Sequence, residues 1–204
     1  MQTKSAKILV WDVPTRVFHW SLAVSFFGAF LTAESERLRD IHVVLGYTVF
    51  GLIAFRVLWG LIGTRYARFS SFVQGPAAVL AYLKSLLTGR PQHYVGHNPV
   101  GGWVIVALLA MGLLSGMTGY ATYNEIGGEW LEELHEGVAN GMLNLVFLHI
   151  AGVVVSSWLH RENLVRAMFS GYKHGDAAQS IRRAHWMIGG TLLTGVLAWW
   201  SGVV

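Results

Sequence analysis

Cysteine and charge are the two things this 204-residue sequence lacks. It contains no cysteine, which excludes disulfide bonds, iron–sulfur clusters held by thiolates and covalent attachment of a haem through a C-x-x-C-H motif. Asp, Glu, Lys and Arg together supply only 13% of the residues, about half the share that is usual in a soluble domain. Hydrophobic residues supply 53%. This balance predicts a membrane protein.

Charged side chains are missing from four long stretches, and a fifth stretch holds a single arginine, Arg56. A helix needs about 20 apolar residues to cross ~30 Å of hydrocarbon, and most of the five stretches reach that length. The sequence therefore predicts one all-helical membrane domain over residues 1–204. Its five expected transmembrane helices lie at about residues 17–35, 41–63, 99–122, 136–159 and 184–204.

The positions of the charges predict the orientation. With a cytoplasmic N-terminus, thirteen of the fifteen Lys and Arg residues fall on the inside. The outer segments carry Arg37 and Arg39 and are otherwise acidic, with Glu34, Glu36, Asp40, Glu125, Glu129, Glu132, Glu133 and Glu136. By the positive-inside rule, the N-terminus is expected in the cytoplasm and the C-terminus on the opposite side. Because topology explains the net charge of +4, we expect no nucleic-acid partner.

The segment between the second and third predicted spans is too polar to cross a membrane. Within it, PAAVLAYLKSLL at residues 76–87 predicts a short helix on the cytoplasmic face, with Gly75 before it and Gly89 after it.

Nine histidines are present, and five of them suggest only loop or interfacial imidazoles: His93, His97, His160, His174 and His185. The other four lie within or at the start of predicted spans. His19 is near the cytoplasmic start of the first span, His42 is near the outer start of the second, and His135 and His149 are in the fourth.

Helix geometry pairs these four residues. Fourteen residues make nearly four turns, so His135 and His149 share one face and lie about 21 Å apart along the axis. The first span runs outward from His19, which is therefore level with His149. The second runs inward from His42, which is level with His135. Two imidazoles facing each other supply both axial ligands of a six-coordinate haem iron. The alternative is hydrogen-bonded core histidines, although polar groups at this depth are costly.

Other residues beside these histidines could serve a haem. Small residues that would leave room for a flat macrocycle are Gly46, Gly137, Gly141 and Gly152, although close helix packing also explains them. Arg16, one turn before His19, is a candidate partner for a haem propionate, and the alternative is an anchor at the inner surface. Without cysteine, any such cofactor would be non-covalent haem b.

Four motifs stand out along the chain: VWDVPTRVFHW, HVVLGYTVFGLIAFRVLWG with GTRYARF after it, GHNPVGGW, and HEGVANGMLNLVFLH. Together they resemble the bacterial cytochrome b561 and nickel-iron hydrogenase b-type cytochrome family, over about residues 7–170. The resemblance implies a four-helix transmembrane core in the bacterial inner membrane. That core would bind two haem b groups through His19, His42, His135 and His149. The fifth predicted helix lies beyond it and has no assigned role.

An iron with both axial positions filled by histidine has no open position for oxygen or substrate, so its chemistry is outer-sphere electron transfer. The function expected first is an electron-transfer subunit without a substrate site of its own. It would link the quinone pool, or another donor, to a periplasmic partner such as a c-type cytochrome or another redox subunit. One alternative is a self-contained quinone-linked oxidoreductase, since some relatives of the resembled family oxidise superoxide. The other is a histidine-lined metal transporter. Membrane lipid is a partner in each case.

Overall fold

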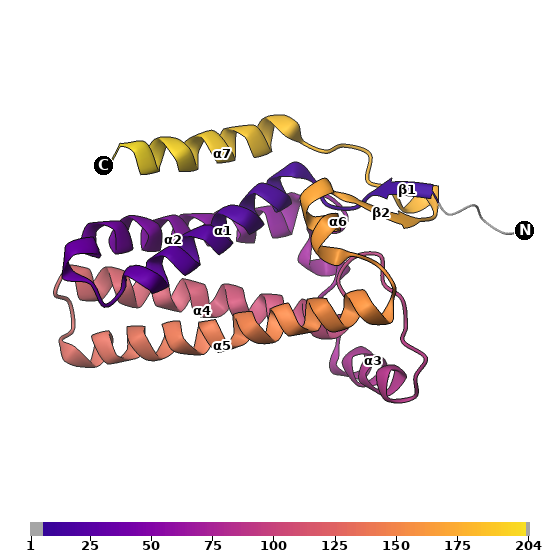
Figure 1. The fold of residues 1–204 in the computed structure, drawn as a ribbon, viewed down its shortest axis with the longest axis horizontal. Coiled ribbons are helices and arrows are strands. Elements are labelled where there is room, and N and C mark those ends of the chain that lie inside the picture. The colour runs from indigo at the N-terminus through magenta and orange to yellow at the C-terminus, as the bar shows by residue number, and fades with distance from the viewer. Residues whose placement is uncertain (1–5, 203–204) are drawn as a thin grey trace, which may run out of the picture.

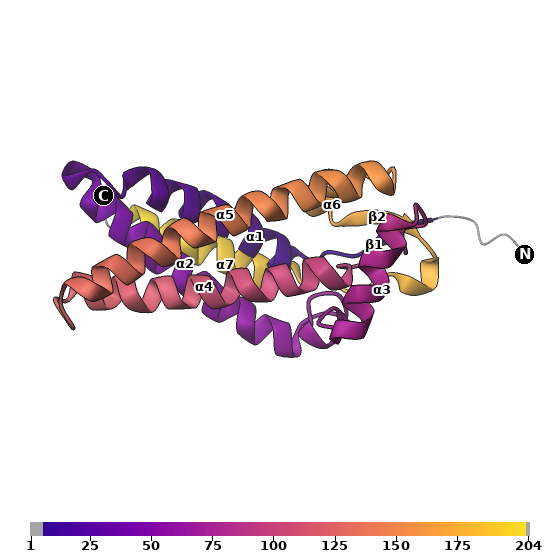
Figure 2. The ribbon, with the colours of Figure 1, turned by 90° about the horizontal axis from the view of Figure 1, so that it is seen from below.

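Helices make up most of the computed structural model, which describes residues 6–202 (Figure 1). Five of them form the body of the molecule: α1 Val13–Thr32, α2 Arg39–Ile62, α4 Pro99–Tyr123, α5 Glu129–Leu159 and α7 Trp186–Ser201. Figures 1 and 2 show all five running along the long axis, with α7 beside α1. The shorter helices are α3 Pro76–Leu87 and α6 Leu164–Ser170, and single 3-10 turns are at Glu36–Leu38, Phe69–Ser71 and Ala177–Gln179. The predicted helical fold and the predicted helix at 76–87 are confirmed.

Within residues 6–202, three helices are long and apolar enough to cross a membrane: Glu36–Ile62, Pro99–Tyr123 and Glu129–Leu159. The first and fifth predicted spans stay predictions. α1 has 20 residues, about 30 Å of helix, but Arg16 and His19 lower the hydropathy of its first turns. α7 has 16 residues, about 24 Å. The last two residues of the predicted span 184–204 lie outside the described residues.

Helix α5 begins at Glu129, before the predicted start at residue 136. The acidic sequence between these positions is too polar for hydrocarbon but continues the helix beyond it. α1 also begins early, because Asp12 accepts a hydrogen bond from the Thr15 amide at 2.8 Å and Pro14 occupies the first turn. An uncharged stretch thus predicts which part of a helix can lie in hydrocarbon. The capping residues determine the residue at which the helix begins.

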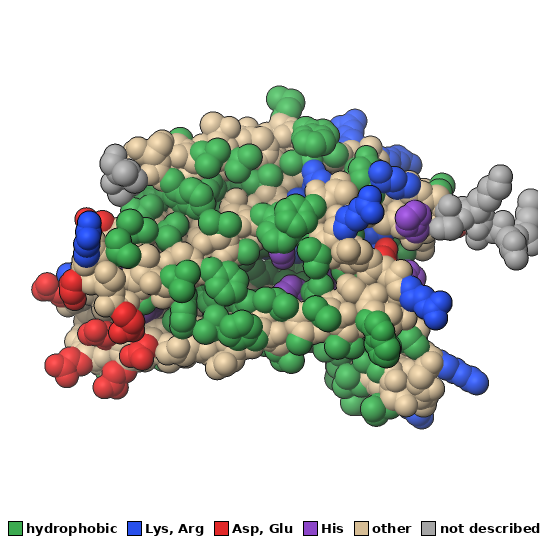
Figure 3. Space-filling model, viewed as in Figure 1, with side chains coloured by type: hydrophobic (Ala, Val, Ile, Leu, Met, Phe, Trp, Pro, Cys, Tyr) green, Lys and Arg blue, Asp and Glu red, His purple; other side chains and the backbone are tan. Residues whose placement is uncertain are grey.

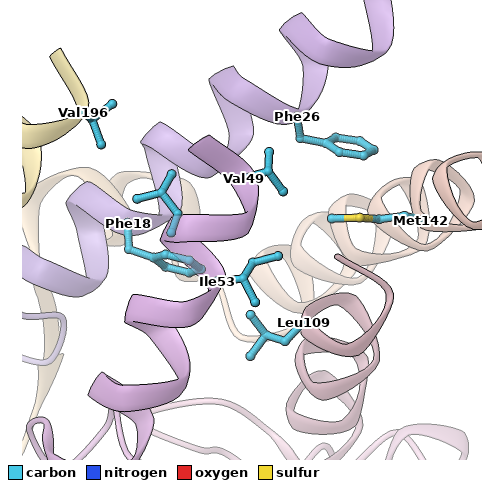
Figure 4. Packing of buried hydrophobic residues seen from close by; sticks show 8 residues of the cluster. Phe18, Phe26, Val49, Ile53, Leu109, Met142 and Val196 are labelled. Carbon is cyan, nitrogen blue, oxygen red and sulfur yellow. The ribbon is translucent and has the colours of Figure 1, made fainter. Parts of the chain in front are cut away.

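One apolar core joins α7 to the bundle of α1, α2, α4 and α5 (Figure 4). Its buried members are Phe18, Phe26, Val49, Leu52, Ile53, Leu109, Met142 and Val196. Ile53 is fully buried, and Gly112 of α4 lies directly against its Cδ1 atom. Any side chain at that glycine would clash with Ile53, so the small residue allows α2 and α4 to approach closely.

A small cap closes one end of the bundle. Strand β1, Ala6–Leu9, pairs antiparallel with β2, Tyr172–Gly175. The sequence does not predict these strands, because segments of four residues carry no clear periodicity. Lys173 is buried on β2, where its Nζ lies 2.8 Å from Glu162 Oε2 and donates to the Val95 carbonyl at 2.9 Å. A second apolar cluster fills the cap and contains Ile8, Val10, Trp11, Tyr66, Ala167 and Ile181.

Charge is separated along the molecule. Figure 3 shows Asp and Glu side chains gathered at the end opposite the cap, and most Lys and Arg side chains at the cap end. This separation agrees with the pattern on which the predicted orientation rests. The orientation itself stays a prediction.

Candidate functional site

His42 of α2 and His135 of α5 come together at the acidic end of the bundle. Their ring centres are 6.2 Å apart and the ring planes are nearly perpendicular, at 88°. His42 Nδ1 lies 2.8 Å from the Ala29 carbonyl, and His135 Nδ1 lies 3.0 Å from the Ser115 carbonyl. A carbonyl can only accept, so each Nδ1 carries the proton and each Nε2 keeps a free lone pair. This tautomer is the one that a metal-binding imidazole needs.

The distance between the two rings suits a metal atom between them. A metal lies about 2 Å from an imidazole nitrogen, so two rings on opposite sides of one metal have centres roughly 6 Å apart. The observed 6.2 Å is close to that value. Gly119 of α4 makes the approach possible, because a Cβ there would lie 2.9 Å from His135 Cε1. Gly119 was not predicted as a site residue, since nothing in the sequence shows that it lies opposite His135.

The predicted glycines differ in what surrounds them. A Cβ at Gly46, Gly137 or Gly152 would meet no atom within 4 Å, whereas one at Gly141 would lie 2.8 Å from Met111 Cε. Gly141 therefore serves close packing of α5 on α4. Gly46, one turn from His42, is partly buried and borders open space. A separate hollow lies near the middle of the face shown in Figure 3, away from the acidic end, with histidine side chains inside it.

His19 of α1 and His149 of α5 form the second pair, toward the cap. Both are partly buried, and they are close enough to be electrostatic neighbours. The His19 ring meets Trp20 edge-on, with ring centres 4.9 Å apart. Its Nδ1 is buried and has no hydrogen-bond partner among the described residues. The structure thus brings the members of both predicted pairs near each other, and a ring-to-ring distance of 6.2 Å is defined for His42 and His135.

Arg16 lies near this second pair and is already engaged. Its Nη1 donates to the Phe169 carbonyl at 2.7 Å, and the guanidinium carbon lies 5.7 Å from the Trp186 ring centre. These contacts tie α1 to α6 and α7. Its Nε atom is buried without a partner among the described residues, so a role toward a propionate stays a prediction.

Two residues that the sequence analysis did not assign to a site meet beside the second pair. The His97 ring packs between Trp11 and Phe72, with ring centres 4.7 and 4.8 Å away. Burial lowers the pKa of His97 to about 3, and the charge of nearby Arg56 acts in the same direction, so the imidazole is neutral at pH 7. Arg56 of α2 is only 3% exposed. In the sequence, Arg56 stands out as the lone charge within a predicted span, and His97 stands out through the motif GHNP.

The grouping of the histidines favours a haem over a metal ion held by side chains alone. Within residues 6–202, no three His, Asp or Glu residues lie close enough together to hold a metal ion. A structural or catalytic metal usually needs three or four protein ligands, whereas haem iron takes only its axial ligands from the protein. The imidazoles of His42 and His135 have free Nε2 atoms, and Gly46 nearby borders open space. This arrangement fits a haem.

Comparisons with known proteins agree with this chemistry. The profile of the family described as prokaryotic cytochrome b561 matches residues 10–171. The probable Ni/Fe-hydrogenase B-type cytochrome subunit of Azotobacter vinelandii is 26% identical, and the match covers 83% of this chain and 90% of that protein. The corresponding subunit of Rhizobium leguminosarum bv. viciae is 25% identical over 80% of this chain and 87% of that protein. The probable Ni/Fe-hydrogenase 1 B-type cytochrome subunit of Escherichia coli (strain K12) is 25% identical over 61% and 65%. No solved structure matches the chain significantly.

Proposed function

Because this chain belongs to the prokaryotic cytochrome b561 family, we propose that it transfers electrons across the membrane between two haem b groups. His42 and His135 hold the outer haem, and His19 and His149 hold the inner one. Family membership supports haem b and electron transport. The observation that carries the proposal is the His42 and His135 pair, whose Nδ1 atoms both donate to backbone carbonyls so that both Nε2 atoms stay free.

A bound haem b supplies one-electron chemistry at its iron. With a haem at each pair, its two histidines would be the protein ligands of the iron and would leave it no open site for oxygen or a substrate. Helix α5 holds one ligand of each pair on a single face, about 21 Å apart along the axis. Met142 lies midway between them and packs with Ile53 in the apolar core. These residues keep water away from the region between the two sites.

The partners follow from the relatives and from the charge pattern. Three relatives are named as Ni/Fe-hydrogenase cytochrome subunits, and we extend that association to this chain. A hydrogenase or another redox protein, such as a c-type cytochrome, exchanges electrons with the outer haem on the periplasmic side. A membrane quinone is the other partner. The chain lies in the inner membrane with its N-terminus in the cytoplasm, and its C-terminus is periplasmic if α7 completes a fifth span.

A pyridine haemochrome assay on the purified, detergent-solubilised chain tests the proposal. Haem b has a characteristic reduced spectrum in this assay, and an independent measurement of protein concentration gives the haem count. We expect two haem b groups per chain. The two-site arrangement would be contradicted if protein reconstituted with excess haem still bound one haem b or none.

The acidic end of α5 predicts a steered encounter with a basic redox partner. Glu129, Glu132 and Glu133 are exposed and lie within two turns of His135. Charge complementarity can raise association rates by about tenfold or more, and it weakens as salt shortens the Debye length. Electron exchange with basic soluble cytochrome c should therefore slow steeply between low and moderate salt. Replacing these three residues by Gln should lower the low-salt rate about tenfold and flatten the salt dependence.

The matched control is Asp176→Asn, which removes an exposed carboxylate at the opposite end and keeps a side chain that can cap. We expect its rate and salt slope to equal those of the parent protein. Haem content should be unchanged in both variants. An unaltered salt slope in the triple Gln variant would show that the acidic end is a solvated surface without a docking role.

A further inference from the structure

Arg56 is a buried cation without an anionic partner. Its guanidinium carbon lies 5.0 Å from the ring centre of Phe69 and 5.9 Å from that of Phe72. Among residues 6–202, the one ion pair within 4 Å joins Lys173 to Glu162. The Nη1 atom of Arg56 is buried and has no hydrogen-bond acceptor in this part of the chain. An uncompensated charge is among the most costly groups to bury, especially in a membrane. The surroundings of Arg56 are therefore suited to binding an anion.

Asp12 is the carboxylate whose charge Arg56 feels, but it is already engaged. Its oxygens accept hydrogen bonds from the Thr15 amide at 2.8 Å, Trp59 Nε1 at 3.1 Å and Thr64 Oγ1 at 2.6 Å. These bonds cap α1 and tie it to the end of α2. Asp12 thus lowers the free-energy cost of burying the Arg56 charge from a distance. It does not accept a hydrogen bond from the Arg56 guanidinium.

His97 brings a second unsatisfied nitrogen to the same place. Its ring packs on Phe72, the ring that the Arg56 guanidinium also approaches. The Nδ1 atom of His97 is buried without a partner among the described residues. His97 is also an electrostatic neighbour of His19 and His149. Two unpaired polar groups from α2 and the segment before α4 therefore converge beside the inner pair of histidines.

We propose that Arg56 and His97 bind one propionate carboxylate of the inner haem, an inference that rests on the proposed function. A guanidinium binds a carboxylate through charge-assisted hydrogen bonds, and a neutral imidazole can donate one more. The positive charge of Arg56 then offsets the propionate charge near the iron and stabilises the reduced, less positive state. Arg56 and His97 are positioning residues that raise the reduction potential of the inner haem.

The test compares Arg56→Gln, Arg56→Lys and His97→Phe in the purified protein carrying its haems. Redox titration gives the potential of each haem, and resonance Raman spectroscopy reports the propionate bending band. The two haems are assigned with His42→Ala, which keeps the inner one. Arg56→Gln should lower the inner potential and shift its propionate band, while the outer haem is unchanged. Arg56→Lys should restore part of the potential because it keeps the charge. His97→Phe should give a smaller shift in the same direction.

Arg182→Gln is the matched control, because it removes an exposed arginine at the same end of the molecule. It should leave both potentials and the Raman band unchanged. If Arg56→Gln does not accumulate, Arg56→Lys and His97→Phe decide the question through the same two readouts. An inner haem with unchanged potential and propionate band in the variants overturns this inference and leaves the proposed function standing. A parent protein without an inner haem overturns the proposed function itself.

Discussion

We expect that replacing His42 or His135 by Ala removes the proposed outer haem b and leaves the proposed inner one in place. Each substitution takes away one of two axial ligands, and the remaining imidazole cannot supply six-coordinate ligation alone. Haem content in the pyridine haemochrome assay should fall by half. Replacing His19 or His149 should remove the inner haem instead. The two single losses are distinguishable by redox titration, because each variant should lose one of the two reduction steps of the parent protein.

The control for this series is His174→Ala, since His174 is exposed on β2 and belongs to neither pair. Its haem content should match that of the parent. Helical content by circular dichroism separates loss of haem from loss of fold. The pairing is wrong if His42→Ala and His149→Ala abolish the same reduction step.

Gly46→Leu should also expel the outer haem, without harming the fold. A Cβ at Gly46 meets no protein atom within 4 Å, so the protein alone offers no steric reason against a larger side chain. Gly46 lies one turn from His42 and is partly buried. If the space beside it belongs to the haem, an isobutyl group there competes with the macrocycle directly. We expect haem content to drop by half and the outer reduction step to disappear.

Gly51→Leu is the matched control, because Gly51 lies on the same helix, also has open space around it, and is exposed on a different face. This variant should keep both haems. Protein yield and helical content should be similar for the two leucine variants. Full haem content in Gly46→Leu would show that the space beside Gly46 is not part of the haem site.

Much of this arrangement follows from the sequence because helices have a simple period. Uncharged stretches predicted the positions of the long helices, and the spacing of His135 and His149 placed them on one face of α5. Direction counting then placed His42 and His19 at matching levels, as the structure has them. Each of these steps uses only local geometry within one helix and the alternation of helix direction.

The rest of the site depends on contacts between distant segments, which no local pattern reveals. Arg56 and His97 meet because α2 and the segment before α4 both pack on Phe72. Gly119 shows its role only when α4 lies against His135. The motif GHNPVGGW marks the segment around His97, but nothing in it shows that the imidazole contacts the interior.

The pairing of β1 with β2 sets an order for biogenesis. Ala6 pairs with Gly175 and Leu9 with Tyr172. Strand β1 is therefore synthesised before α1 to α6, whereas its pairing partner β2 is synthesised after them. Contacts so distant in sequence form late, because the loop between them has to close first. The cap can therefore form only late in synthesis, once β2 is available to pair with β1. We therefore expect the end of the bundle near His19 and His149 to be completed only after β2 has been made.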